Sequence, residues 1–166
     1  GKHDITDVTM EVYRGDSVSA VLDLCEVDKK TAVLNFASYK YAGGGFMNGS
    51  RAQEECLCHE SFLYNVLSAF EDSYYVPNRT DLNKALYKDK ALYSPNIRFV
   101  RNEREAVCDV LTCAAPNYST AKKQVSLAEN NQALRNRVRF ILEIAKRENV
   151  DTFILGAWGC GVFEQD

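Results

Sequence analysis

Three glycines and a Gln-Glu-Glu triplet lie close together in the stretch GGGFMNGSRAQEE, residues 43–55. Glycines let the backbone approach a ligand closely, and a helix that begins near Ala52 would present free N–H groups to an anion. Glu54 and Glu55 would then stand in the first turn of that helix. A phosphate-binding loop beside a catalytic carboxylate fits these residues. A surface turn followed by a dipole-stabilised acidic helix start fits them equally well.

Hydrolysis of a glycosidic bond is the chemistry that such a carboxylate could perform. It needs a carboxyl group that protonates the leaving oxygen while water attacks an oxocarbenium-like centre. The pKa of that acid must lie near neutrality, and burial or a second carboxylate raises it. Glu54 and Glu55 are adjacent, so each supplies the other with a like-charged neighbour.

A second glycine-rich stretch, LGAWGCGVF, spans residues 155–163. The first glycine stretch follows a predicted buried strand over 31–37, and the loop GCGVF (159–163) within the second follows a predicted buried strand over 151–158. Open α/β sheets bind ligands at the carboxyl ends of their strands. The first stretch lacks the Gly-Lys-Ser/Thr of a P-loop. It also fails the dinucleotide pattern G-x-G-x-x-G, because Asn48 stands where the third glycine belongs. Neither nucleotide motif is therefore indicated.

The remaining pattern alternates strands and helices, with no repeat and no linker. This order predicts one α/β domain over residues 1–166, a three-layer α/β/α fold with a mixed central sheet. The irregular, tyrosine-rich stretch 71–95 could cover the core or cap a ligand. The predicted elements are strands over 8–14, 31–37, 96–102, 106–116 and 151–158, a helix over SVSAVLDL capped by Asp16, and helices over 52–70 and 123–149.

Composition narrows the classes of function. The net charge of −3 argues against a protein that binds nucleic acid through its backbone, and no apolar run is long enough to span a bilayer. The basic residues Arg135, Arg137 and Arg139 fit the solvated face of a helix. The six cysteines are interpreted as reduced, which favours a cytoplasmic protein. The zinc-like run over 56–59 has no second half, so no metal is expected.

Four blocks carry a resemblance to a known family. The chain resembles the microbial-type poly(ADP-ribose) glycohydrolases from about residue 8 to its end, and the resemblance implies a macrodomain-like α/β/α fold. It also implies one catalytic domain over 1–166 that is shorter than its relatives at both ends. The blocks are LNFASYKYAGGGFMNGSRAQEECLCHESFLY (34–64), YSPNIRFVR (93–101), TCAAPN (112–117) and LGAWGCGVF (155–163).

The resemblance also implies an activity and a site. The family hydrolyses the ribose–ribose O-glycosidic bond of poly(ADP-ribose), without a metal or other cofactor. Glu55 would be the general acid/base, and Glu54 would bind and orient the ribose. The substrate-binding residues implied are Asn35, Gly43, Gly44, Gly45, Asn48, Gln53, Gly159, Cys160, Gly161, Val162 and Phe163.

Two other functions stay open from the sequence. A macrodomain that binds ADP-ribose without hydrolysing it needs the loops but not the acid. A hydrolase of mono-ADP-ribose would use the same residues as a polymer hydrolase. Expected partners are poly(ADP-ribose), ADP-ribose and ADP-ribosylated proteins, with no membrane and no sequence-specific nucleic acid.

Overall fold

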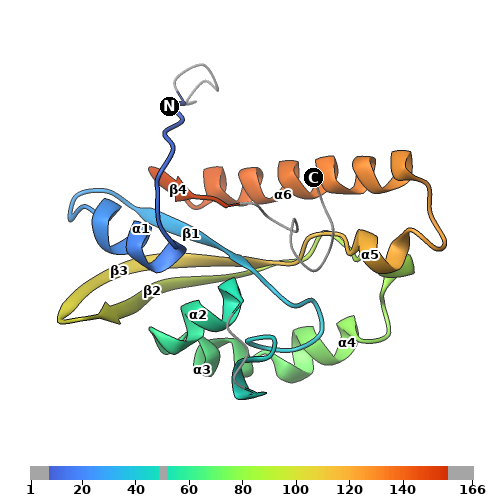
Figure 1. Cartoon of the computed structure of the whole chain (residues 1–166), viewed down its shortest axis with the longest axis horizontal. Coiled ribbons are helices and arrows are strands. Elements are labelled where there is room, and N and C mark those ends of the chain that lie inside the picture. Colours follow the sequence, from blue (N-terminus) through green and yellow to red (C-terminus); the bar gives the residue numbers. More distant parts are fainter. Residues whose placement is uncertain (1–7, 49–51, 157–166) are drawn as a thin grey trace.

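The computed structural model describes residues 8–48 and 52–156, and it forms a sheet with helices on both of its faces (Figure 1). The elements in chain order are α1 (Ser17–Leu24), β1 (Thr31–Phe36), η2 (Phe46–Asn48), α2 (Gln53–His59), α3 (Leu63–Ser68), the π-helix η3 (Glu71–Tyr75), α4 (Val76–Asn78), η4 (Asn83–Ala85), β2 (Leu92–Arg101), β3 (Arg104–Cys113), α5 (Tyr118–Ala121), α6 (Leu127–Arg147) and β4 (Thr152–Ile154).

The sheet is mixed and has the strand order β2-β3-β1-β4. Strand β1 pairs in parallel with both β3 and β4, whereas β2 is antiparallel to β3. The carboxyl ends of β1, β3 and β4 therefore meet at one edge of the sheet. The register between β1 and β3 places Asn35 opposite Thr112 at that edge.

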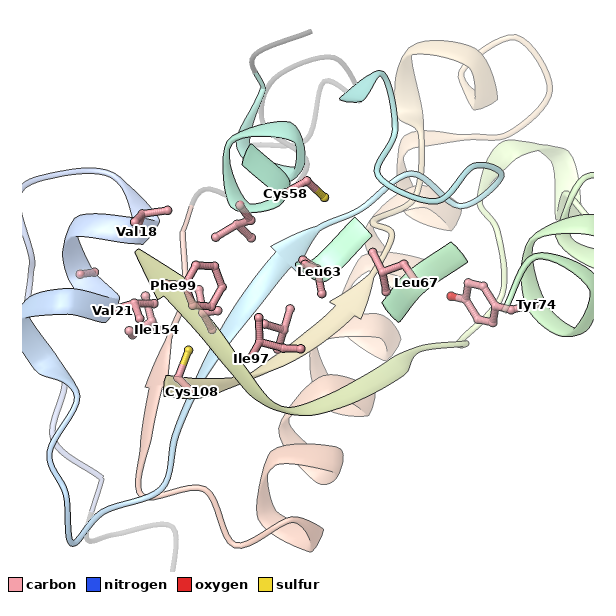
Figure 2. Close-up of a cluster of buried hydrophobic side chains, with 14 of the residues drawn as sticks. Val18, Val21, Cys58, Leu63, Leu67, Tyr74, Ile97, Phe99, Cys108 and Ile154 are labelled. Carbon is pink, nitrogen blue, oxygen red and sulfur yellow. The ribbon is translucent and has the colours of Figure 1, made fainter. Parts of the chain in front are cut away.

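The side chains of β1 pack alternately into two hydrophobic clusters, one on each face of the sheet. Val33 packs into a cluster with Val21 of α1, Leu57 of α2 and Leu67 of α3, part of which is shown in Figure 2. The next residue, Leu34, points to the other face and packs against Ile141 and its neighbours on α6. Successive side chains of a strand point to opposite faces. The continuous apolar run of β1 is thus explained by helices on both sides, and the predicted three-layer arrangement with a mixed sheet is confirmed.

Most predicted elements are present, with shifted ends. Asp16 caps α1 by accepting a hydrogen bond from the Ser19 N–H at 2.8 Å, as predicted. Helix α6 begins at Leu127 rather than at 123, because Ser126 caps it. Strand β2 begins four residues earlier than predicted, and its pairing shifts between Ser94 and Ile97. The stretch 71–95 contains three short helical turns, η3, α4 and η4, and the first residues of β2, and its Tyr74 and Tyr75 lie in the core.

Two predictions are wrong. Residues 8–14 form no strand: no described strand pairs with their backbone, and Val8, Met10 and Val12 are 72–95% exposed. The predicted helix over 52–70 is two helices. Chain segment 60–62 interrupts it, because the Glu60 carbonyl accepts a hydrogen bond from the Val100 N–H of β2 at 2.9 Å.

Arg137 also differs from its prediction as part of a solvated basic face. It is 1% exposed, whereas Arg135 and Arg139 are exposed. Its guanidinium donates to the carbonyls of Ala114 at 2.6 Å and Leu86 at 2.9 Å, and to Asp89. Helix periodicity locates the buried face but does not show that a charged residue on it has partners.

Among the described residues, no helix is both long enough and apolar enough to cross a membrane.

Replacing Arg137 by methionine is expected to lower the free energy of unfolding by roughly 3 kcal/mol. The methionine fills much of the same volume but leaves the Leu86 carbonyl without the Arg137 donor, and the Ala114 carbonyl with only the Cys113 thiol at 3.8 Å. Urea unfolding measures the change, with Arg139→Met on the exposed face of the same helix as the matched control. Equal stability of the two variants would show that Arg137 does not hold these segments together.

Candidate active site

Gln53 fastens the start of α2 to the end of β1. Its Oε1 accepts a hydrogen bond from the Phe36 N–H at 2.8 Å, and its Nε2 donates to the Leu34 carbonyl at 3.0 Å. The same nitrogen donates to Ser17 Oγ at 3.1 Å. Strand β4 ends at Ile154, opposite Val33, so beyond that point no described residue pairs with β1 as a strand on this side. The glutamine amide takes up the backbone groups that the short β4 leaves unpaired.

Glu54, the next residue, is held beneath the surface by neutral donors. It is 2% exposed, and its Oε1 accepts a hydrogen bond from the Ser38 N–H at 2.9 Å. Its Oε2 accepts one from Asn35 Nδ2, also at 2.9 Å. Burial raises the pKa of Glu54 to about 7; the bonds from Ser38 and Asn35 oppose this rise, and the charge of Glu55 adds to it. Glu54 is therefore a carboxyl group that can exchange a proton near neutral pH.

Glu55 lies against the glycine loop. It is 7% exposed, and its Oε1 accepts a hydrogen bond from the Gly45 N–H at 3.2 Å. Gly44 has a φ of +58°, and a Cβ atom there would lie 3.2 Å from Glu54 Oε1 and 3.5 Å from Glu55 Oε1. Gly43 has a φ of +70°, and a Cβ there would lie 2.8 Å from the ring of Tyr64. The loop approaches both carboxylates closely because its residues lack side chains.

A layer of buried polar groups lies beneath the two glutamates. Burial is the largest cause that raises the pKa of the Cys58 thiol to about 12, and the charges of Glu54 and Glu55 add to the rise. Burial and the charge of Glu54 also raise the pKa of Tyr75. The Tyr75 hydroxyl and the Asn35 Oδ1 atom are buried, and neither has a hydrogen-bond partner within residues 8–48 and 52–156. The glutamates thus face a part of the core in which no cation among the described residues balances their charge.

The sequence-predicted site residues separate into three groups. The structure brings Asn35, Gly44 and Gly45 against Glu54 and Glu55, and Gly43 precedes them in the same turn. Gln53 binds the backbone of β1 on either side of Asn35, at Leu34 and Phe36. Asn48 lies at the exposed end of η2. Outside the described residues lie Gly159, Cys160, Gly161, Val162 and Phe163.

Thr112 belongs to the site but was not identified from the sequence. Its Oγ1 accepts a hydrogen bond from Asn35 Nδ2 at 3.1 Å, and it is 0% exposed. The signal in the sequence was the block TCAAPN, which begins at Thr112, within the predicted strand over 106–116.

A surface hollow of about 200 Å³ lies on the outward side of α2, lined by Cys56, His59, Glu60 and Arg101. Arg101 is already bonded to Asp16 and Glu60. In the part of the chain that the structure describes, no three His, Cys, Asp or Glu side chains are grouped so that they could hold a metal ion.

Comparison with known proteins identifies the fold and the family. The family model for the microbial-type PARG catalytic domain matches residues 2–102. A search of curated proteins finds no significant match.

Solved structures of bacterial poly(ADP-ribose) glycohydrolases are similar to the chain. The enzyme from Deinococcus radiodurans in complex with ADP-ribose is 34% identical with a TM-score of 0.82, over 95% of this chain and 66% of that one. The enzyme from Thermomonospora curvata bound to the inhibitor ADP-HPD is 36% identical with a TM-score of 0.77, over 84% of this chain and 54% of that one. The E115A mutant of the Thermomonospora curvata enzyme is 35% identical to the chain with a TM-score of 0.76, again over 84% of this chain and 54% of that one.

The chain thus spans between about half and two thirds of the length of these structures. Their similarity extends over most of the sheet and its helices, which confirms the expected macrodomain-like fold. The chain belongs to the microbial-type poly(ADP-ribose) glycohydrolase family.

Proposed function

We propose that the protein hydrolyses the ribose–ribose O-glycosidic bond of poly(ADP-ribose) and releases ADP-ribose. The observation that carries this proposal is the contact between the glycine loop and two buried adjacent carboxylates, Glu54 and Glu55, at the carboxyl end of β1. A similar structure from the same family was solved in complex with ADP-ribose. A domain that only recognised ADP-ribose would have no need of two buried acids, which are costly to ionise.

Glu55 acts as the general acid/base in this proposal. It gives its proton to the departing ribose oxygen as the glycosidic bond breaks, and it then takes a proton from the attacking water, so that it is regenerated. The bond from the Gly45 N–H to Oε1 fixes one of its oxygens. Glu54 accepts from Asn35 and Ser38, and it binds and orients the ribose on the cleaved side.

The glycine loop binds the rest of the substrate. Positive φ angles at Gly43 and Gly44 give a turn that is open to a diphosphate and a ribose. Gln53 supports this turn through its clamp on β1. Asn48 and the stretch 159–163 remain predicted substrate contacts.

The same proposal includes the setting in which the protein works. Its substrates are poly(ADP-ribose) and, through it, ADP-ribosylated proteins. A cytoplasmic location fits the cysteines, because Cys25, Cys58 and Cys108 form no disulfide among the described residues.

Replacing Glu55 by glutamine is expected to lower the release of ADP-ribose from purified poly(ADP-ribose) by about 10²–10⁴-fold, because the amide cannot transfer the proton. The affinity for ADP-ribose, measured by calorimetry, should stay within about threefold, since the shape of the side chain is kept. Glu143→Gln, an exposed substitution on α6, is the matched control. Folded wild-type protein that binds ADP-ribose but releases none would instead identify a binding domain.

Glu54→Gln tests the raised pKa. A carboxyl group whose pKa is higher in the folded protein than in the unfolded chain binds its proton more tightly when folded. Stability therefore falls as the pH rises from about 4.5, the ordinary value, to about 7. The glutamine variant lacks this loss, so its stability relative to the wild type should increase across that interval by up to about 3 kcal/mol.

Urea unfolding at a series of pH values measures this difference. Glu143→Gln again serves as the control, and its difference from the wild type should be the same at every pH. Parallel curves for the wild type and Glu54→Gln would show that Glu54 titrates in the folded protein as it does in the unfolded chain.

A further inference from the structure

The Asn35 side chain joins two strands and a helix at the site. It is 0% exposed, and its Nδ2 donates to Glu54 Oε2 at 2.9 Å and to Thr112 Oγ1 at 3.1 Å. An amide nitrogen carries two hydrogens, so these two bonds use both of them. The orientation of the amide is thereby fixed, with its nitrogen toward the Glu54 carboxylate.

The sheet itself brings Thr112 to this position. Asn35 and Thr112 are paired in the parallel register of β1 and β3. Thr112 is 0% exposed, so its hydroxyl contacts protein rather than solvent. The acceptor for the second amide hydrogen therefore comes from the central strand β3 and not from a loop.

Thr112 is needed because Asn35 has few other anchors. Its Oδ1 is buried and accepts no hydrogen bond from the described residues. Without the threonine hydroxyl, the amide would be held by Glu54 alone. An amide that is held only by Glu54 would follow the carboxylate instead of fixing it.

We propose that Thr112 is a positioning residue for Glu54 and acts through Asn35. This inference rests on the proposed function, in which Glu54 orients the ribose. Thr112 touches neither the reacting atoms nor Glu54 itself. With the Ser38 N–H on Oε1 and Asn35 on Oε2, both oxygens of the carboxylate are fixed, and so is its plane.

The groups around Glu54 determine how this role would be detected. Helix α2 contributes Glu55 and Cys58, and η3 contributes Tyr75; ionisation of any of the three would oppose a charge on Glu54. Strands β1 and β3 contribute only the neutral side chains of Asn35 and Thr112. A hydrogen bond donated to a carboxylate favours its charged form. A loosened Asn35 therefore makes Glu54 bind its proton more tightly.

The decisive comparison is between Thr112→Val and Thr112→Ser. Valine keeps the shape of the side chain and removes the hydroxyl, whereas serine keeps the hydroxyl and removes a methyl group. We expect Thr112→Val to lower kcat/KM for poly(ADP-ribose) about tenfold, as for one lost hydrogen bond, and Thr112→Ser to stay within about twofold of the wild type. Both variants should be less stable than the wild type in urea, because serine loses a buried methyl group and valine leaves the Asn35 amide without an acceptor, so stability does not separate them as activity does.

A second readout does not depend on activity. The Glu54 carboxyl carbon can be followed by NMR in protein with isotope-labelled glutamate, and its signal is assigned by its loss in Glu54→Gln. In Thr112→Val the titration midpoint of Glu54 should move upward by about half a pH unit or more, and in Thr112→Ser it should not move. This titration still tests the positioning role if the wild type releases no ADP-ribose, an outcome that would overturn the proposed function alone.

Thr31→Val is the control, because Thr31 is a buried threonine at the start of β1. It should leave both kcat/KM and the Glu54 midpoint unchanged. If Thr112→Val does not fold, Thr112→Ala and Thr112→Ser give the same comparison, since both lack the methyl group and only serine keeps the hydroxyl. An unchanged midpoint in the variant without the hydroxyl, or an equal shift in Thr112→Ser, would overturn the proposal.

Discussion

Two adjacent carboxylates, buried with no balancing cation among the described residues, are the constraint on which the site depends. An ionised carboxylate taken out of water is costly, and its charge must be met by hydrogen bonds or given up by protonation. In this protein the donors are neutral: the N–H groups of Ser38 and Gly45 and the amide of Asn35. Neutral donors offset only part of the cost, and a carboxyl group near its titration point is the result at Glu54. The same balance suits a reaction in which a proton is given and taken back.

Such donors work only if the backbone that carries them is fixed, and the architecture around β1 provides this. Ser38 N follows β1 directly, and Asn35 lies within the strand. Gln53 then ties the first turn of α2 to the backbone of β1 at Leu34 and Phe36. The shortness of β4 is part of this arrangement, because a longer strand would pair with the groups that Gln53 binds. The strand end, the loop and the helix start therefore form one unit.

The sequence allowed the fold class, most elements and the core of the site to be predicted, because these depend on local pattern. Glu54 and Glu55 follow the glycines closely in the chain, and β1 shows its burial by its apolar run. Thr112 was missed because it lies 77 residues from Asn35, and only the strand register brings them together. Arg137 was misjudged because its carbonyl partners belong to distant segments. Alternation over 8–14 describes how a strand would place its side chains but not whether a sheet edge will accept it.

The support of the site extends beyond the stretch that carries its motif. The family model matches residues 2–102, which include Asn35, Ser38 and Gly45, the described residues that hydrogen-bond directly to the two glutamates. Thr112 lies outside that stretch, on the strand that joins β1 to β2. A chain with the glycines and Gln-Glu-Glu but another residue at this point of β3 would keep the chemistry and lose one anchor of its geometry. The motif alone therefore specifies which groups react, and the central strand pairing contributes to how firmly they are held.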